Sequence, residues 1–169
     1  NGAFRIFPAR HSVSCGSYDP RERPWYVAAS SGPKDVVIIL DTSGSMYQHG
    51  RMDLAKTAAK DVIDALTIGD HFGVVEFSHS AQILNPASRL LQATAANKVT
   101  MKALIDGLDA EGSTNFYASF EEAFDLIDAS VADEFTSDCQ KAILFLTDGE
   151  MTNEHTAQEV YDLINQRNL

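Results

Sequence analysis

Continuous apolar runs alternate along this chain with segments whose apolar residues recur at helical spacing. The runs at 36–40 and 142–146 hold only aliphatic and aromatic residues and one alanine. Such runs are typical of strands buried on both faces of a parallel sheet. Two further strands are expected at 72–77 and, as a short strand before Pro86, at 82–84.

Four segments between and after these runs have the period of amphipathic helices: 55–66, 97–108, 116–127 and 156–164. In the second, one face is predicted to carry Met101, Leu104, Ile105 and Leu108. In the third, a phenylalanine stripe is expected to lie in the core rather than to bind a ligand. Thr156 and Glu159 are spaced as a capping box for the last helix.

The alternation of strands and helices predicts an α/β fold, a doubly wound and mostly parallel sheet flanked by helices. The chain ends in a helix at the point where an alternating fold should enter another strand. We therefore expect the sequence to be truncated at its C-terminus, with the last one or two strands and a helix missing.

Composition and charge divide the chain near residue 33. Residues 1–35 carry five Lys or Arg against three Asp or Glu, a balance of +2, whereas residues 36–169 carry eight against twenty-one, a balance of −13. The shift coincides with a linker-like Ser-Ser-Gly-Pro stretch at 30–33. We predict a short N-terminal segment, 1–33, and one well-cored domain, 34–169.

The acidic domain disfavours nucleic acid as a partner, because it would repel the phosphate backbone. No apolar stretch approaches the roughly 18 to 20 residues that a membrane-spanning helix needs. The two cysteines, Cys15 and Cys139, lie on opposite sides of the boundary. They could form one disulfide in an oxidising compartment or remain two buried thiols, and the sequence leaves both open.

The first apolar run leads directly into Asp41-Thr42-Ser43-Gly44-Ser45-Met46. In extended backbone, residues two apart project to the same side, so Asp41, Ser43 and Ser45 could direct three oxygens to one point. Oxygen ligands with a single carboxylate suit a hard divalent cation such as Mg²⁺. The alternative is an ordinary strand-to-helix turn with a serine N-cap.

Two more polar elements are expected near that motif. Asp148 follows the strand at 142–146, and Thr114 lies in the loop before the phenylalanine-striped helix. In doubly wound sheets, ligands gather at the carboxyl ends of the strands. Together with Asp41, Ser43 and Ser45, these residues could offer up to five oxygens. Water or an acidic side chain of a partner would complete an octahedral shell.

This set of motifs resembles that of von Willebrand factor type A domains: Asp-x-Ser-x-Ser after the first strand, a later Gly-x-Thr, and Thr-Asp-Gly after the fourth strand. The resemblance covers residues 34–169. It implies a metal-ion-dependent adhesion site in which Asp41, Ser43 and Ser45 supply the first-loop contacts, Thr114 the second and Asp148 the third. The metal implied is Mg²⁺, with Ca²⁺ or Mn²⁺ as alternatives.

A narrower resemblance lies upstream, at 18–27 and 33–35. The sequence Tyr-Asp-Pro-Arg-Glu-Arg-Pro-Trp-Tyr-Val, followed by Pro-Lys-Asp, is similar to the join between a Cache-type and a type A domain in calcium channel alpha-2-delta subunits. It implies that residues 1–33 are the tail of a Cache-like domain. In amino-acid-sensing Cache domains a like motif binds the ligand, so the resemblance makes candidate contacts of Tyr18, Arg23, Trp25 and Tyr26. Alternatively, Trp25 and Tyr26 pack the linker onto the type A domain.

These resemblances imply a divalent-cation-dependent binding module of a larger extracellular or membrane-anchored protein, whose metal accepts a carboxylate from a protein partner. One alternative is part of an amino-acid-sensing receptor. Another is a metal-dependent hydrolase, for which His49 is the nearest candidate base. We expect no enzyme activity, because neither a nucleophilic cysteine nor a well-placed histidine falls in the three loops.

Overall fold

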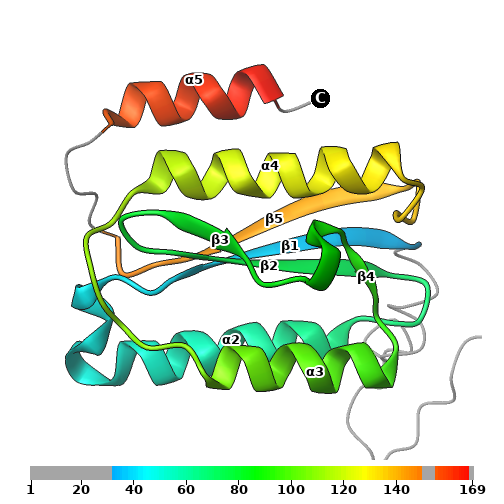
Figure 1. Ribbon diagram of the computed structural model, residues 1–169, viewed down its shortest axis with the longest axis horizontal. Coiled ribbons are helices and arrows are strands. Elements are labelled where there is room, and N and C mark those ends of the chain that lie inside the picture. Colours follow the sequence, from blue (N-terminus) through cyan, green and yellow to red (C-terminus); the bar gives the residue numbers. More distant parts are fainter. Residues whose placement is uncertain (1–31, 150–154, 168–169) are drawn as a thin grey trace, which may run out of the picture. The chain divides into compact units, whose positions relative to one another are not determined.

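The computed structural model describes residues 32–149 and 155–167 (Figure 1). The chain divides into two units, Asn1–Gly32 and Pro33–Leu169. All of the described helices and strands belong to the second unit. Whether residues 1–33 are the tail of a Cache-like domain stays a prediction, because they lie almost wholly outside the described residues.

The sheet is built around β1, whose two neighbours both run parallel to it. Its strands are β1 (Lys34–Asp41), β2 (His71–Phe77), β3 (Ala81–Ile83), β4 (Leu91–Gln92) and β5 (Gln140–Leu146). The order is β3-β2-β1-β5, and β4 also pairs with β2. Because β3 and β4 run antiparallel to β2, the sheet is mixed, with its longer strands parallel. This confirms the predicted α/β fold, and β4 is a strand that the sequence pattern did not predict.

The helices cover both faces of the sheet. They are α2 (Arg51–Ala65), α3 (Ala95–Asp106), α4 (Phe116–Ala132) and α5 (Ala157–Arg167), with short 3₁₀ helices η2 (Gly44–Gly50) and η3 (Pro86–Ser88). Figure 1 shows α2 and α3 below the sheet, α4 above it and α5 packed on the outer side of α4. Of the described helices, none is both long and apolar enough to cross a membrane.

The core follows the alternation of side chains along β1. Val36, Ile38 and Leu40 pack toward α2 and α3, and Val37 and Ile39 toward α4. Phe116, Phe120 and Ile127 of the predicted stripe on α4 lie in the second cluster, and Phe124 is buried as well. There Phe116 and Phe120 contact Phe145 of β5, with ring centroids 4.8 and 5.0 Å apart.

A glycine in β2 allows α4 to pack closely on the sheet. A Cβ at Gly73 would lie 2.5 Å from Cδ2 of Leu126 and 3.0 Å from Cδ2 of Leu90. Both leucines are fully buried. Any larger residue at Gly73 would therefore push α4 away from the sheet and disturb the elements that carry the loops at its end.

Two predictions about burial were wrong. The strand at 142–146 was expected to be buried on both faces, yet β5 is partly exposed along its length, and Leu144 is 39% exposed. The cause is its position, because α4 packs mainly over β2, β3 and β1 and α2 packs over β1, while β5 lies at the margin of the described sheet. Leu104 was placed on the buried face of α3 but is 40% exposed.

Local sequence signals set the ends of the helices. The hydroxyl of Thr94 accepts a hydrogen bond from the backbone N–H of Asn97 and caps α3, which therefore begins two residues earlier than predicted. The predicted capping box is confirmed: the backbone N–H of Thr156 donates to Glu159 Oε2, and that of Glu159 donates to Thr156 Oγ1.

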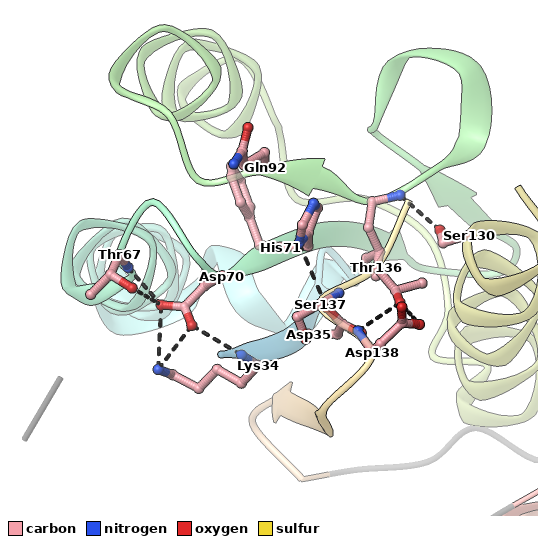
Figure 2. A network of polar contacts seen from close by, with 12 residues as sticks. Lys34, Asp35, Thr67, Asp70, His71, Gln92, Ser130, Thr136, Ser137 and Asp138 are labelled. Carbon is pink, nitrogen blue, oxygen red and sulfur yellow. Dashed lines mark hydrogen bonds and ion pairs between the residues drawn. The ribbon is translucent and has the colours of Figure 1, made fainter. Parts of the chain in front are cut away.

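Polar contacts also close the amino end of the sheet (Figure 2). The buried carboxylate of Asp70 accepts hydrogen bonds from the backbone N–H and Nζ of Lys34 and from the backbone N–H and hydroxyl of Thr67, at 2.6 to 3.3 Å. At the start of β1, Oδ1 of Asp35 accepts the backbone N–H of Ser137 at 2.7 Å, and Nδ1 of His71 lies 3.9 Å from the same oxygen. These contacts join the starts of β1 and β2 to the segment before β5.

Candidate metal centre

The first loop begins where β1 ends, at the fully buried Asp41. Its Oδ1 accepts the backbone N–H of Ser43 at 2.8 Å. Ser43 occupies the N-cap position of η2 but makes no side-chain capping bond. Its hydroxyl lies 3.0 Å from that of Ser45 instead. The simple serine-cap interpretation is therefore wrong.

The backbone conformation that brings Asp41, Ser43 and Ser45 together differs from the predicted one. We predicted that Asp41, Ser43 and Ser45 would project from one side of extended backbone. The strand ends at Asp41, however, and η2 begins at Gly44. The tight 3₁₀ turn brings the two serine hydroxyls together.

The third loop lies beside the first because β5 pairs with β1. Leu40 is opposite Leu146 in the parallel register, so Thr147 follows at the level of Asp41. Thr147 Oγ1 donates to Asp41 Oδ2 at 2.6 Å and accepts the backbone N–H of Gly149 at 3.1 Å. The side chain of Asp148 is 6% exposed. Within the part of the chain that the structure describes, its buried Oδ1 has no hydrogen-bond partner.

The second loop is attached to the first by the backbone. The N–H of Glu111 donates to the carbonyl of Thr42 at 2.7 Å, and the N–H of Gly44 donates to the carbonyl of Gly112 at 3.0 Å. Gly112 has a φ of +81°, a conformation that favours glycine. This loop carries the buried Thr114 just before α4. The three loops thus lie together at the carboxyl end of the sheet, on the left in Figure 1.

Two residues of this region were missed by the sequence reasoning. Thr147 orients Asp41, and Arg51, the first residue of α2, donates from Nη1 to Asp148 Oδ2 at 2.7 Å. Arg51 did carry a signal: a basic residue in the first turn of a helix opposes the helix dipole and therefore calls for an acidic partner.

The surroundings of the three loops are acidic. Burial raises the pKa of the Glu76 carboxyl group on β2, and the negative charge of Glu111 on the second loop raises it further. Such an environment disfavours additional negative charge and favours a bound cation.

The available donor groups fit a hard divalent cation. They are carboxylate and hydroxyl oxygens, which Mg²⁺ prefers, and neither cysteine nor histidine is part of the set. The unpartnered Oδ1 of Asp148 is the kind of buried atom that a bound ion would satisfy. That Asp41, Ser43, Ser45, Thr114 and Asp148 hold a metal remains a prediction.

Other predicted site residues lie apart from this cluster or outside the described residues. The candidate amino-acid contacts lie outside the described residues: Tyr18, Arg23, Trp25 and Tyr26. Cys15 lies outside them as well. Cys139 is exposed rather than buried. Its pairing with Cys15 stays a prediction. His49 is exposed near the end of η2, as expected for a rim residue.

Comparison with protein families gives one match that covers most of the described domain. Residues 36–150 match the family model described as von Willebrand factor type A domain. Over 170 aligned residues the chain is 36% identical to the human voltage-dependent calcium channel subunit alpha-2/delta-2, covering 99% of this chain. It spans 14% of the length of that relative.

Solved structures show the same fold. A von Willebrand factor type A protein from Catenulispora acidiphila aligns with a TM-score of 0.66 at 30% identity, over 79% of this chain and 30% of that one. Proximal thread matrix protein 1 from the mussel byssus, with a zinc-occupied MIDAS motif, aligns with a TM-score of 0.61 at 23% identity, over 80% of this chain and 33% of that one. At that identity, the second likeness concerns the fold alone.

Proposed function

The chain belongs to the von Willebrand factor type A domain family, and from that premise we propose that it is a divalent-cation-dependent protein-binding module. Its cation is Mg²⁺, with Ca²⁺ or Mn²⁺ as alternatives, held by Asp41, Ser43 and Ser45, by Thr114 and by Asp148. Some of these side chains contact the ion through a bridging water molecule. A carboxylate of the protein partner supplies a remaining ligand.

One observation carries this proposal. The three loops come from distant parts of the chain, yet they are bonded to one another at the carboxyl end of the sheet, where Asp148 keeps a buried oxygen without a partner in the described residues. Neutral hydroxyl ligands offset little of the positive charge of a divalent ion, so the ion stays electrophilic and attracts a carboxylate.

The proposed setting is the cell surface. The 36% identical relative is a subunit of a voltage-dependent calcium channel, of which this chain spans only a part. We propose by this relationship that the parent protein is extracellular or membrane-anchored, and that the type A domain is its interaction module. The partner is a protein, and the acidic surface disfavours nucleic acid.

A catalytic role is disfavoured by the same loops. Of the described residues in them, the histidine nearest the metal-ligand candidates in sequence is His49, and it is exposed. Its backbone has a φ of +57° in the turn that leads to α2. A hydrolase would need a base or a nucleophile within hydrogen-bond reach of the bound water.

The test is capture of a partner on immobilised protein. Wild-type chain, Asp41→Asn and Asp64→Asn are coupled to resin, exposed to a detergent extract of cell-surface proteins in Mg²⁺ and eluted with EDTA. Asp64 is an exposed aspartate of α2 that pairs with Lys102, so its variant is a matched control. We expect a protein that elutes from wild type and Asp64→Asn and is absent from Asp41→Asn.

Circular dichroism must show that all three proteins are folded. The captured protein is then purified, and its affinity is measured by surface plasmon resonance with and without Mg²⁺. Equal affinity in Mg²⁺ and EDTA, or undiminished binding to Asp41→Asn, would refute the proposal.

A further inference from the structure

Arg51 stands at a position where its charge is unfavourable for the helix that carries it. It is the first residue of α2, at the positive end of the helix dipole. Acidic residues are preferred there. A basic residue at this point therefore indicates a compensating interaction outside the helix.

That interaction is with the candidate metal site. Nη1 of Arg51 lies 2.7 Å from Oδ2 of Asp148, and at 3.5 Å it also approaches the backbone carbonyl of Ser45. One guanidinium nitrogen thus faces residues of the first and third loops at once. The backbone directs it there through two consecutive left-handed residues, His49 and Gly50, with φ of +57° and +70°.

The two aspartates of the site differ in how their charge is balanced. Asp41 accepts hydrogen bonds from neutral groups, the backbone N–H of Ser43 and the hydroxyl of Thr147. Within the described residues, the ion pair of the site is the one between Arg51 and Asp148. Arg51 is 43% exposed and Asp148 is 6% exposed, so the carboxylate is fixed while the guanidinium can leave toward solvent.

We propose that Arg51 is an internal counter-ion that competes with the divalent cation for Asp148. Without metal, its guanidinium neutralises the buried carboxylate and holds the third loop against the first. When the cation binds, the ion replaces the guanidinium and Arg51 turns outward to the rim of the site. This inference rests on the proposed metal site and adds a residue that sets its affinity.

Two opposite effects follow from this exchange. Arg51 stabilises the metal-free protein, because removing it leaves a buried carboxylate without a counter-charge. It also weakens cation binding, since the ion must displace one positive charge and any guanidinium left nearby repels it. A residue that merely supported the fold would stabilise both states equally.

The experiment compares wild type with Arg51→Gln and Arg89→Gln. Arg89 is the matched control, because it is 37% exposed and forms an ion pair with Asp133 elsewhere on the surface. Mg²⁺ affinity is measured by isothermal titration calorimetry, and melting temperature is measured in EDTA and in saturating MgCl₂. For Arg51→Gln we expect about tenfold tighter Mg²⁺ binding, the effect of one partly screened charge.

The expected melting pattern is equally specific. Arg51→Gln should melt below wild type in EDTA and approach it in MgCl₂, whereas Arg89→Gln should respond to Mg²⁺ as wild type does. Unchanged or weaker Mg²⁺ affinity of Arg51→Gln, with wild type binding normally, would overturn the role of Arg51 while leaving the proposed function intact. Absence of Mg²⁺ binding in all three proteins would overturn both.

Discussion

Buried aspartates lie at both ends of the sheet, and they differ in their hydrogen-bond partners. At the amino end, Asp70 before β2 is surrounded by donors of its own chain, from Lys34 and Thr67. Asp35 on β1 accepts one backbone N–H, and its Oδ2 has no hydrogen-bond partner among the described residues. At the carboxyl end, Asp41 has two neutral partners, and Asp148 has one exposed arginine and an unpartnered oxygen among the described residues.

This difference separates a structural carboxylate from one suited to binding. A carboxylate that is saturated by fixed donors stabilises the fold and has nothing left for a ligand. One that faces hydroxyls and keeps a free lone pair is incompletely satisfied until an ion arrives. A buried oxygen without a partner does not by itself mark a binding site, because Oδ2 of Asp35 at the amino end has none among the described residues either. The serine and threonine hydroxyls beside the carboxylates distinguish the carboxyl end.

The amino end should give the largest effect on stability. Asp70→Ala removes an acceptor of several hydrogen bonds and leaves Lys34 without its counter-ion, so we expect the free energy of unfolding to fall by about 3 kcal/mol. Urea unfolding should show the same loss in EDTA and in MgCl₂. A loss that Mg²⁺ restores would break the proposed distinction between the two ends.

The same residue should produce part of the acid sensitivity. Burial alone would raise the pKa of Asp70, but hydrogen bonds from Thr67 and the pairing with Lys34 outweigh it, so the pKa is lowered. The stability it contributes is therefore present above pH of about 4 and is lost as pH falls through the lower folded-state pKa. The free energy of unfolding, measured between pH 6 and pH 2, should fall less steeply with decreasing pH for Asp70→Asn than for wild type.

At the carboxyl end, Thr147→Val keeps the shape of the side chain and removes its hydroxyl. Asp41 loses the hydrogen bond of 2.6 Å that orients it, and we expect the free energy of unfolding in EDTA to fall by about 1 kcal/mol. Mg²⁺ affinity, measured by calorimetry, should fall as well. Thr67→Val is the matching change at the amino end, and it should lower stability without affecting Mg²⁺ binding.

Glu76→Gln should have the smallest effect and the opposite sign. Because burial and Glu111 raise the pKa of Glu76, the folded protein binds this proton more tightly than the unfolded chain does. Ionised Glu76 therefore costs stability at neutral pH, and that cost disappears as pH falls. The melting temperature of Glu76→Gln should exceed that of wild type at pH 7, and the gain should shrink toward pH 4.

Much of the fold and of the site chemistry was accessible from the sequence. The apolar runs predicted the parallel strands. The candidate ligands stood out as polar residues that follow a strand or precede a helix: Asp41, Ser43, Ser45, Thr114 and Asp148. The hydrogen-bond partners of Thr147 and Arg51 were not accessible. They depend on the register between β1 and β5 and on the turn before α2, which residue types do not specify.

The solvent exposure of the strands could not be predicted from the local apolar pattern either. The run at 142–146 is as apolar as the run at 36–40, yet β1 lies at the centre of the sheet and β5 lies at the margin of its described part. Periodicity reports which residues share a face. How well that face is covered depends on the elements packed against it.

Titrating MgCl₂ into the metal-free chain in a calorimeter shows whether the carboxyl end of the sheet binds a divalent cation. Asp41→Asn and Asp64→Asn are titrated in parallel. We expect one Mg²⁺ site in wild type and in Asp64→Asn, and its loss in a folded Asp41→Asn. Equal binding by Asp41→Asn, or no binding by wild type, would contradict it.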